Sequence, residues 1–168
     1  FEDIKKMNLD GHTPWIFEIS PSHGWLPLGF AKRELKFNFF GKNLNQPALK
    51  KIKDWLPQGI WADKPQDNQT KILVCFEALE HMARPEDLPQ SAHKIGIDFD
   101  RIYLSTPKYC LGGGLPDWKT RRLGHLRNWT PNEFLDFANK SFKGYAWTYF
   151  DSHSMVIRGE RQDTAERV

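Results

Sequence analysis

Short apolar runs alternate along this chain with segments in which apolar residues recur at helical spacing. The clearest run is Lys71-Ile72-Leu73-Val74-Cys75-Phe76, which has the composition of a buried strand. In residues 46–56, by contrast, the apolar positions recur every three or four residues, as in a helix. Such alternation of strand and helix predicts an α/β fold: a largely parallel sheet with helices on both faces.

The same pattern places the individual elements. The predicted strands are residues 15–19, 35–40, 59–61, 71–76 and 101–105. The predicted helices are residues 25–33, 46–56, 85–95 and one that begins at Thr130, where Thr130-Pro131-Asn132-Glu133 has the pattern of a capping box. Two closing strands, 145–150 and 154–158, are expected to form an antiparallel pair.

The domain organisation follows from these elements. We expect a single domain over residues 1–168, with an N-terminal extension at 1–13 and a polar, frayed tail at 162–168. A long irregular loop, 106–128, separates the fifth strand from the last helix and contains Gly112-Gly113-Gly114. Loops of this length in compact domains are usually functional, and a mobile lid is the favoured interpretation of this one.

Composition narrows the class of protein. The chain has 168 residues, of which 39% are hydrophobic and 14% aromatic, so it can bury a globular core. Its net charge of +3, from 24 basic and 21 acidic residues, is too small to indicate nucleic-acid binding. Two cysteines, Cys75 and Cys110, are interpreted as reduced thiols. With no apolar run of about 18 residues, no membrane span is expected, and a cytoplasmic location follows by default.

The candidate catalytic and metal-binding residues follow directly after the predicted strand 71–76. The segment Glu77-Ala78-Leu79-Glu80-His81 places two carboxylates and an imidazole within five positions, and His125 follows in the long loop. Open α/β sheets carry their sites beyond the carboxyl ends of the strands. Oxygen and nitrogen ligands of this kind can bind one divalent cation.

These features, taken in order, resemble a class I S-adenosylmethionine-dependent methyltransferase over residues 14–158. In that family the first strand ends in an acidic residue followed by a glycine-rich turn, which lets the backbone approach the cofactor. Glu18 and Gly24 match this motif, whereas Ser20 and Ser22 replace its first two glycines. The resemblance implies a Rossmann-like sheet with the strand order three-two-one-four-five, a closing antiparallel strand, and a bound S-adenosylmethionine.

The resemblance also implies further cofactor contacts. Asn43 stands where the family usually has the acid that binds the ribose hydroxyls, and an amide lacks the charge-assisted strength of that bond. Asp63 resembles the acid that meets the adenine amino group, and Phe76 falls where a side chain packs on the cofactor. The expected cofactor-binding residues are therefore Glu18, Ser20, Ser22, Gly24, Asn43, Asp63 and Phe76.

The Glu-x-x-Glu-His element with a later histidine is similar to metal-dependent small-RNA 2′-O-methyltransferases, and ubiquinone-pathway O-methyltransferases share its first part. This resemblance implies Mg²⁺ or Mn²⁺ ligands at Glu77, Glu80, His81 and His125. Alternatively, His81 or His125 without a metal would act as the catalytic base. The expected activity is methyl transfer to a hydroxyl of a small molecule or an RNA.

Two other functions stay open at this stage. Ser20, Ser22 and Asn43 are three departures in one pocket, and they favour a catalytically degenerate protein with a binding or assembly role. An RNA-binding module using the basic loop and Trp118 is disfavoured by the modest net charge.

Overall fold

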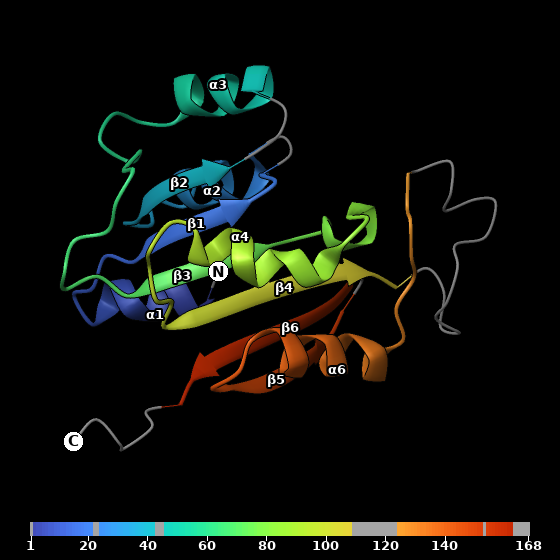
Figure 1. The fold of residues 1–168 in the computed structure, drawn as a ribbon. Coiled ribbons are helices and arrows are strands. Elements are labelled where there is room, and N and C mark those ends of the chain that lie inside the picture. The colour runs from blue at the N-terminus through green and yellow to red at the C-terminus, as the bar shows by residue number, and fades with distance from the viewer. Residues whose placement is uncertain (1, 22–23, 43–45, 109–123, 153, 163–168) are drawn as a thin grey trace. The chain divides into compact units, whose positions relative to one another are not determined.

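A computed structural model describes residues 2–21, 24–42, 46–108, 124–152 and 154–162. The chain forms two compact units, residues 1–75 and 76–168. Each unit contributes helices and strands, which Figure 1 labels in chain order.

Three parallel strands form the first unit. Its elements are α1 (Glu2–Leu9), β1 (Trp15–Ile19), α2 (Trp25–Ala31), β2 (Asn38–Lys42), α3 (Gln46–Trp55) and β3 (Lys71–Cys75). β1 lies between β2 and β3 and pairs with both in parallel. All five residues of β1 are buried, because a central parallel strand is covered on both faces, and four of the five are apolar, Glu18 being the exception.

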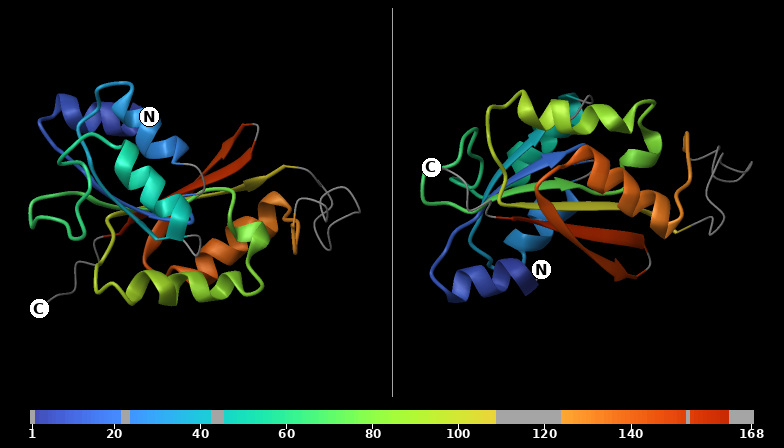
Figure 2. Two further views of the ribbon diagram at one scale, coloured as in Figure 1. Left: turned by 90° about the horizontal axis from the view of Figure 1, so that it is seen from above. Right: turned by 60° about the horizontal axis from the view of Figure 1, so that its bottom comes forward.

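Helices cover the strands of this unit. In Figure 2, α1 and α2 lie on the same side of the strands. The unit's core contains the fully buried side chains of Trp15, Phe17, Phe39, Ile52 and Leu73.

Strand pairing in the second unit is antiparallel. Its elements are the 3₁₀ helices η1 (Leu79–His81) and η2 (Pro85–Asp87), then α4 (Leu88–His93), β4 (Arg101–Pro107), α6 (Pro131–Ser141), β5 (Tyr145–Asp151) and β6 (Ser154–Arg161). β6 lies between β4 and β5 and is antiparallel to both. The helices α4 and α6 cover one face of these strands (Figure 2). Burial alternates along β6, because successive side chains of a strand point to opposite faces of the sheet.

Most predicted elements are confirmed, with shifts at their ends. The predicted strand 35–40 is instead β2 at Asn38–Lys42, and the predicted strand 59–61 is reduced to one parallel bridge between Trp61 and Phe39. The predicted helix 85–95 consists of η2 followed by α4. Within the N-terminal extension, for which no element was predicted, residues Glu2–Leu9 form the helix α1, which buries Ile4 and Met7.

The α/β class and the closing antiparallel strand are confirmed. Within the first unit the predicted order is confirmed: the Trp61 bridge, β2, β1 and β3 follow one another across the sheet. Within the second unit the two closing strands follow β4 in the order β6, β5. Most of the 106–128 loop lies outside the described residues, although Thr106 and Pro107 belong to β4. Among the described helices, none combines the length and the apolar character that a membrane span requires.

Candidate metal and cofactor sites

The 3₁₀ helix η1 presents the acidic and imidazole groups that follow β3. Its first residue, Leu79, is fully buried and anchors the turn in the core of the second unit. Glu80 is also buried, at 1% exposure, whereas His81 is exposed. A carboxylate this deeply buried needs a partner, because desolvation strongly penalises an isolated charge.

Three candidate ligands converge in this unit. Single donor atoms of Glu80, His81 and His125 all lie within 4.8 Å of one another. The His81 and His125 rings meet edge to face with their centroids 4.9 Å apart, and His81 Nε2 lies 3.7 Å from Glu80 Oε1. Donor atoms on one ion, at about 2.0–2.2 Å each, are separated by at most about 4.4 Å. A small contraction would therefore bring all three onto a divalent ion.

Backbone groups of the 124–126 segment hold these ligands in place. His81 Nδ1 lies 3.0 Å from the Gly124 carbonyl oxygen. Because a carbonyl only accepts, Nδ1 carries the proton of a neutral ring, which leaves Nε2 with the free lone pair that a metal requires. The Leu126 N–H donates to the Glu80 carbonyl oxygen at 2.7 Å, which ties the segment that carries His125 to η1.

Burial also sets the protonation of the cluster. Desolvation, with a smaller contribution from the charge of Glu77, raises the pKa of Glu80 to about 7, although its own backbone, His81 and Thr106 oppose this. The Thr106 hydroxyl donates to Glu80 Oε2 at 3.4 Å. Burial and the neighbouring His81 lower the pKa of His125. His125 is therefore neutral at pH 7, the form in which imidazole binds metals.

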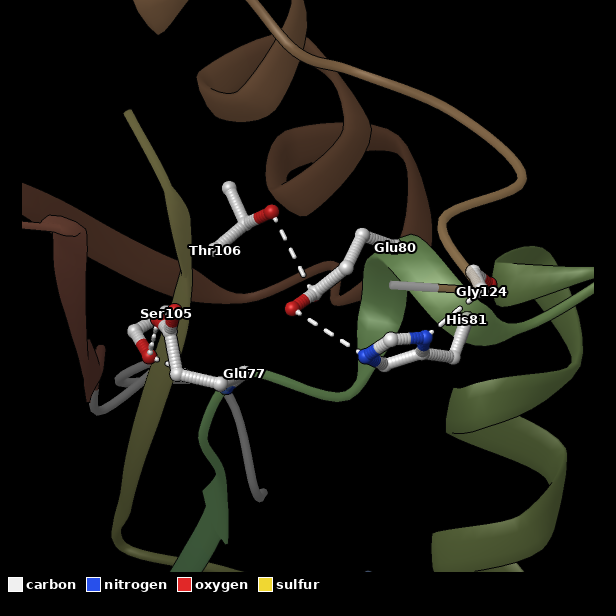
Figure 3. Close-up of polar contacts among 6 residues, drawn as sticks. All are labelled: Glu77, Glu80, His81, Ser105, Thr106 and Gly124. Atoms are coloured by element: carbon white, nitrogen blue, oxygen red, sulfur yellow. Dashed lines mark hydrogen bonds and ion pairs between the residues drawn. The ribbon is translucent and has the colours of Figure 1, made fainter. Parts of the chain in front are cut away.

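Glu77 lies apart from this group. Figure 3 shows its carboxylate directed toward Ser105 of β4, whereas the Glu80 carboxylate lies between Thr106 and His81. The Ser105 hydroxyl donates to Glu77 Oε1 at 2.6 Å. Of the four predicted metal ligands, the structure brings together three.

The predicted cofactor residues fall mainly in the first unit. Glu18 is 5% exposed at the end of β1, and its Oε2 has no hydrogen-bond partner among the described residues. Burial raises the pKa of Glu18 to about 8. A buried carboxyl oxygen without a partner in this position can accept a hydrogen bond from a ligand, so the chemistry of Glu18 fits the cofactor.

The turn after β1 keeps the backbone conformation that a glycine would adopt. Ser20 has φ of 61°, in the left-handed region, and its N–H donates to the Lys42 carbonyl oxygen at 2.7 Å. Gly24, with φ of 75°, is the N-cap of α2. A Cβ at Gly24 would lie 2.9 Å from Ile52 Cγ1, so this position requires glycine for both its conformation and its packing.

The remaining predicted site residues are less informative. Asp63 is exposed, and its Oδ1 accepts a hydrogen bond from Trp61 Nε1 at 2.8 Å. Phe76 is half-buried and is the first residue of the second unit. The predicted site residues Ser22 and Asn43, together with Cys110, Gly112-Gly113-Gly114 and Trp118, lie outside the described residues.

A cavity of about 490 Å³ occurs in the second unit, away from the candidate ligands. It lies where β4 begins and α6 ends, and its lining includes Phe99, Ile102, Phe142 and Tyr145. None of the residues of the metal cluster lines it, so concavity alone does not identify the site.

Sequence reasoning missed the hydrogen-bond partners of these side chains: Ser105 for Glu77, Thr106 for Glu80 and the Gly124 carbonyl for His81. A signal for the first two existed, because adjacent hydroxyl residues end a predicted strand, where parallel α/β sheets collect their polar groups. No side-chain pattern could reveal a backbone carbonyl.

Comparisons with known proteins give the fold. No family model matches the chain, and no curated relative matches it. Among solved structures, an S-adenosylmethionine-dependent methyltransferase from Mesorhizobium loti matches with a TM-score of 0.65 and 14% identity, over 95% of this chain and 96% of its own. Magnesium protoporphyrin IX methyltransferase from Synechocystis PCC 6803, with bound SAH, matches with a TM-score of 0.58 and 13% identity, over 96% and 80%.

A third match is a chain of the Pnkp1/Rnl/Hen1 RNA repair complex. It has a TM-score of 0.62 and 14% identity over 95% of this chain, which spans only 40% of the matched one. Together these similarities show that the chain has the fold of class I S-adenosylmethionine-dependent methyltransferases, as its sequence predicted.

Proposed function

We propose that this protein transfers a methyl group from S-adenosylmethionine to a hydroxyl oxygen, with a divalent cation held by Glu80, His81 and His125. One observation carries the proposal. In a chain with the methyltransferase fold, one carboxylate and two imidazoles from separate segments converge within 4.8 Å, and the backbone fixes the His81 tautomer that a metal ligand needs. Two nitrogens and one oxygen suit Mn²⁺, Fe²⁺ or Mg²⁺ better than a structural zinc, which more often takes thiolates.

The cofactor would be held by residues of the first unit. The Glu18 carboxyl would accept a hydrogen bond from it, and the left-handed backbone at Ser20 and at Gly24 would let the chain approach it. The fold supports this assignment, since one matched structure contains SAH. Asn43 and Asp63 are proposed contacts on the basis of the sequence.

Methyl transfer places few demands on the protein beyond alignment of the acceptor with the methyl group. The acceptor oxygen forms a bond to the methyl carbon, the carbon–sulfur bond breaks, and the sulfonium becomes a thioether. The hydroxyl proton must leave, and a bound cation would lower the acceptor's pKa. In the alternative without a metal, His81 Nε2, which carries no proton in the tautomer described, would accept that proton.

The proposed acceptor is the class that the sequence also predicts. A hydroxyl on a small molecule or on an RNA fits the cluster, and the similarity to a chain of an RNA repair complex favours RNA. The contrasting proposal, a degenerate methyltransferase fold that only binds or assembles, is supported by Ser20, Ser22 and Asn43 in place of the usual residues.

Calorimetric titration distinguishes these functions. We expect the protein to bind S-adenosylmethionine and its demethylated product, and to bind Mn²⁺ in a way that Glu80→Ala abolishes. Glu86→Ala, at an exposed position outside the cluster, is the matched control and should leave Mn²⁺ binding unchanged. Absence of cofactor binding at about 1 mM, a very weak affinity by any standard, would favour the degenerate alternative.

A further inference from the structure

Glu77 has a backbone conformation that glutamate rarely adopts. Its φ is 49°, in the left-handed region, which is strained for a residue that carries a side chain. Such a conformation persists only where surrounding contacts hold it. Among the described residues, the hydrogen bonds of Glu77 are made with Ser105 of β4.

Ser105 provides three hydrogen bonds to Glu77. The Glu77 N–H donates to the Ser105 carbonyl oxygen at 3.2 Å and to its hydroxyl oxygen at 3.1 Å. The Ser105 hydroxyl donates in return to Glu77 Oε1 at 2.6 Å. Ser105 is itself 4% exposed, so its hydroxyl has little access to competing water. We call these three bonds the Glu77–Ser105 clasp.

The clasp lies immediately before the turn that carries two candidate ligands. Two residues, Ala78 and Leu79, separate Glu77 from Glu80, and η1 begins at the second of them. The left-handed residue lies between the end of β3 and the start of η1, so its conformation affects the direction in which η1 leaves the strand. The same hydrogen bonds direct the Glu77 carboxylate away from the cluster of Glu80, His81 and His125.

We propose that Glu77 is a positioning residue rather than a metal ligand, and that its clasp to Ser105 holds η1 so that Glu80 and His81 face His125. This inference rests on the proposed function, because it concerns the same cation. The two carboxylates of Glu-x-x-Glu-His thus have different tasks: Glu80 binds the ion, and Glu77 orients the turn. An octahedral ion with three protein ligands then keeps about three positions for water and acceptor oxygens.

Substitutions at Glu77 separate a positioning role from a ligand role. Glutamine keeps an oxygen that can accept from Ser105, so Glu77→Gln retains the clasp while removing the charged ligand. Alanine removes the acceptor and leaves an unsupported left-handed residue. A positioning role predicts that Glu77→Gln binds Mn²⁺ within about threefold of the wild type and that Glu77→Ala binds it at least tenfold more weakly. Glu80→Gln should lose at least tenfold.

The measurements are Mn²⁺ titration by electron paramagnetic resonance and the number of water molecules on bound Mn²⁺ from proton relaxation. Wild type and Glu77→Gln should both show about three waters. Ser105→Ala should weaken Mn²⁺ binding as Glu77→Ala does, and Ser105→Thr, which restores a hydroxyl, should recover it. Thermal unfolding of each variant establishes whether it is folded. If the alanine variants do not fold, the Mn²⁺ affinity of Glu77→Gln decides by itself whether Glu77 is a ligand or a positioning residue.

The outcomes separate this inference from the function it rests on. If Glu77→Gln loses as much Mn²⁺ affinity as Glu80→Gln, or gains one water, then Glu77 is a ligand and the inference is overturned while the metal site stands. If the wild type binds no Mn²⁺ at about 1 mM, both the metal site and the inference fail, and cofactor titration still tests the methyltransferase.

Discussion

The side chain of Glu18 makes the stability of the folded protein depend on pH. Its carboxyl is 5% exposed, and burial raises its pKa from 4.5 to about 8. The folded protein therefore keeps the Glu18 proton at pH values where the unfolded chain has released it. Stability from this group is fully present below pH 4.5 and is lost as the pH rises toward 8.

We expect Glu18→Gln to remove this pH dependence. Between pH 5 and pH 7.5, the wild-type free energy of unfolding should fall by an amount approaching roughly 1.4 kcal/mol per pH unit from Glu18 alone. Glutamine does not titrate, so the variant should become more stable relative to the wild type as the pH rises. Urea unfolding at both pH values measures this. Asp10→Asn, at an exposed position of the same unit, is the control, and equal slopes for wild type and Glu18→Gln would contradict the prediction.

Gly24 tests the turn that the cofactor would approach. Alanine there combines a φ of 75° with a Cβ 2.9 Å from the Ile52 side chain, so we expect about 2–3 kcal/mol of destabilisation. Gly59→Ala separates the two causes, because Gly59 has φ of 87° and nothing within 4 Å of its added Cβ. Denaturant unfolding should show the larger loss for Gly24→Ala. Similar losses for the two variants would show that the Ile52 contact is unimportant.

At the scale of elements, α6 is the helix whose start the sequence specifies most fully. Thr130 Oγ1 accepts from the Glu133 N–H at 3.2 Å, and the Glu133 carboxylate accepts from the Thr130 N–H at 2.8 Å. Pro131 occupies the first turn, where its missing N–H costs nothing. The helix then buries Phe134 and Ala138 against the core of the second unit.

We therefore expect Thr130→Ala to reduce the free energy of unfolding by about 1 kcal/mol, because it removes the cap and leaves the Glu133 N–H without its side-chain acceptor. Thr130→Ser keeps the hydroxyl and should stay within a few tenths of a kcal/mol of the wild type. The comparison by urea unfolding isolates the cap from side-chain volume. Equal losses in both variants would assign the effect to the lost methyl group instead.

At the scale of the whole molecule, we expect cofactor binding to depend most on Ser20, Ser22 and Asn43, where the sequence differs from the methyltransferase cofactor motif. The proposed cofactor residues lie largely in the first unit, and the proposed metal ligands lie in the second. A ligand that binds only the folded chain raises its stability in proportion to its occupancy. Thermal stability in the presence of the cofactor therefore reports on binding without any knowledge of the acceptor.

We expect a variant with Ser20→Gly, Ser22→Gly and Asn43→Asp to bind S-adenosylmethionine about tenfold more tightly or better than the wild type. The restored acid gains a charge-assisted bond of roughly 1–2 kcal/mol, and the glycines remove crowding at the turn. The melting temperature at saturating cofactor should rise further for this variant than for the wild type. If neither protein responds to cofactor at about 1 mM, the binding-only alternative gains support.

The sequence by itself determined the elements, their parallel pairing within the first unit and the segment that carries the chemistry, because periodicity and capping are local properties of the chain. The tertiary structure decided which residues of that segment act together. Glu77 and Glu80 are equivalent in the motif, yet the left-handed Glu77 pairs with Ser105, 28 residues further on, while Glu80 meets His81 and His125. Spacing along the chain cannot distinguish the two carboxylates, because their directions depend on a hydroxyl that only the folded β4 strand brings to them.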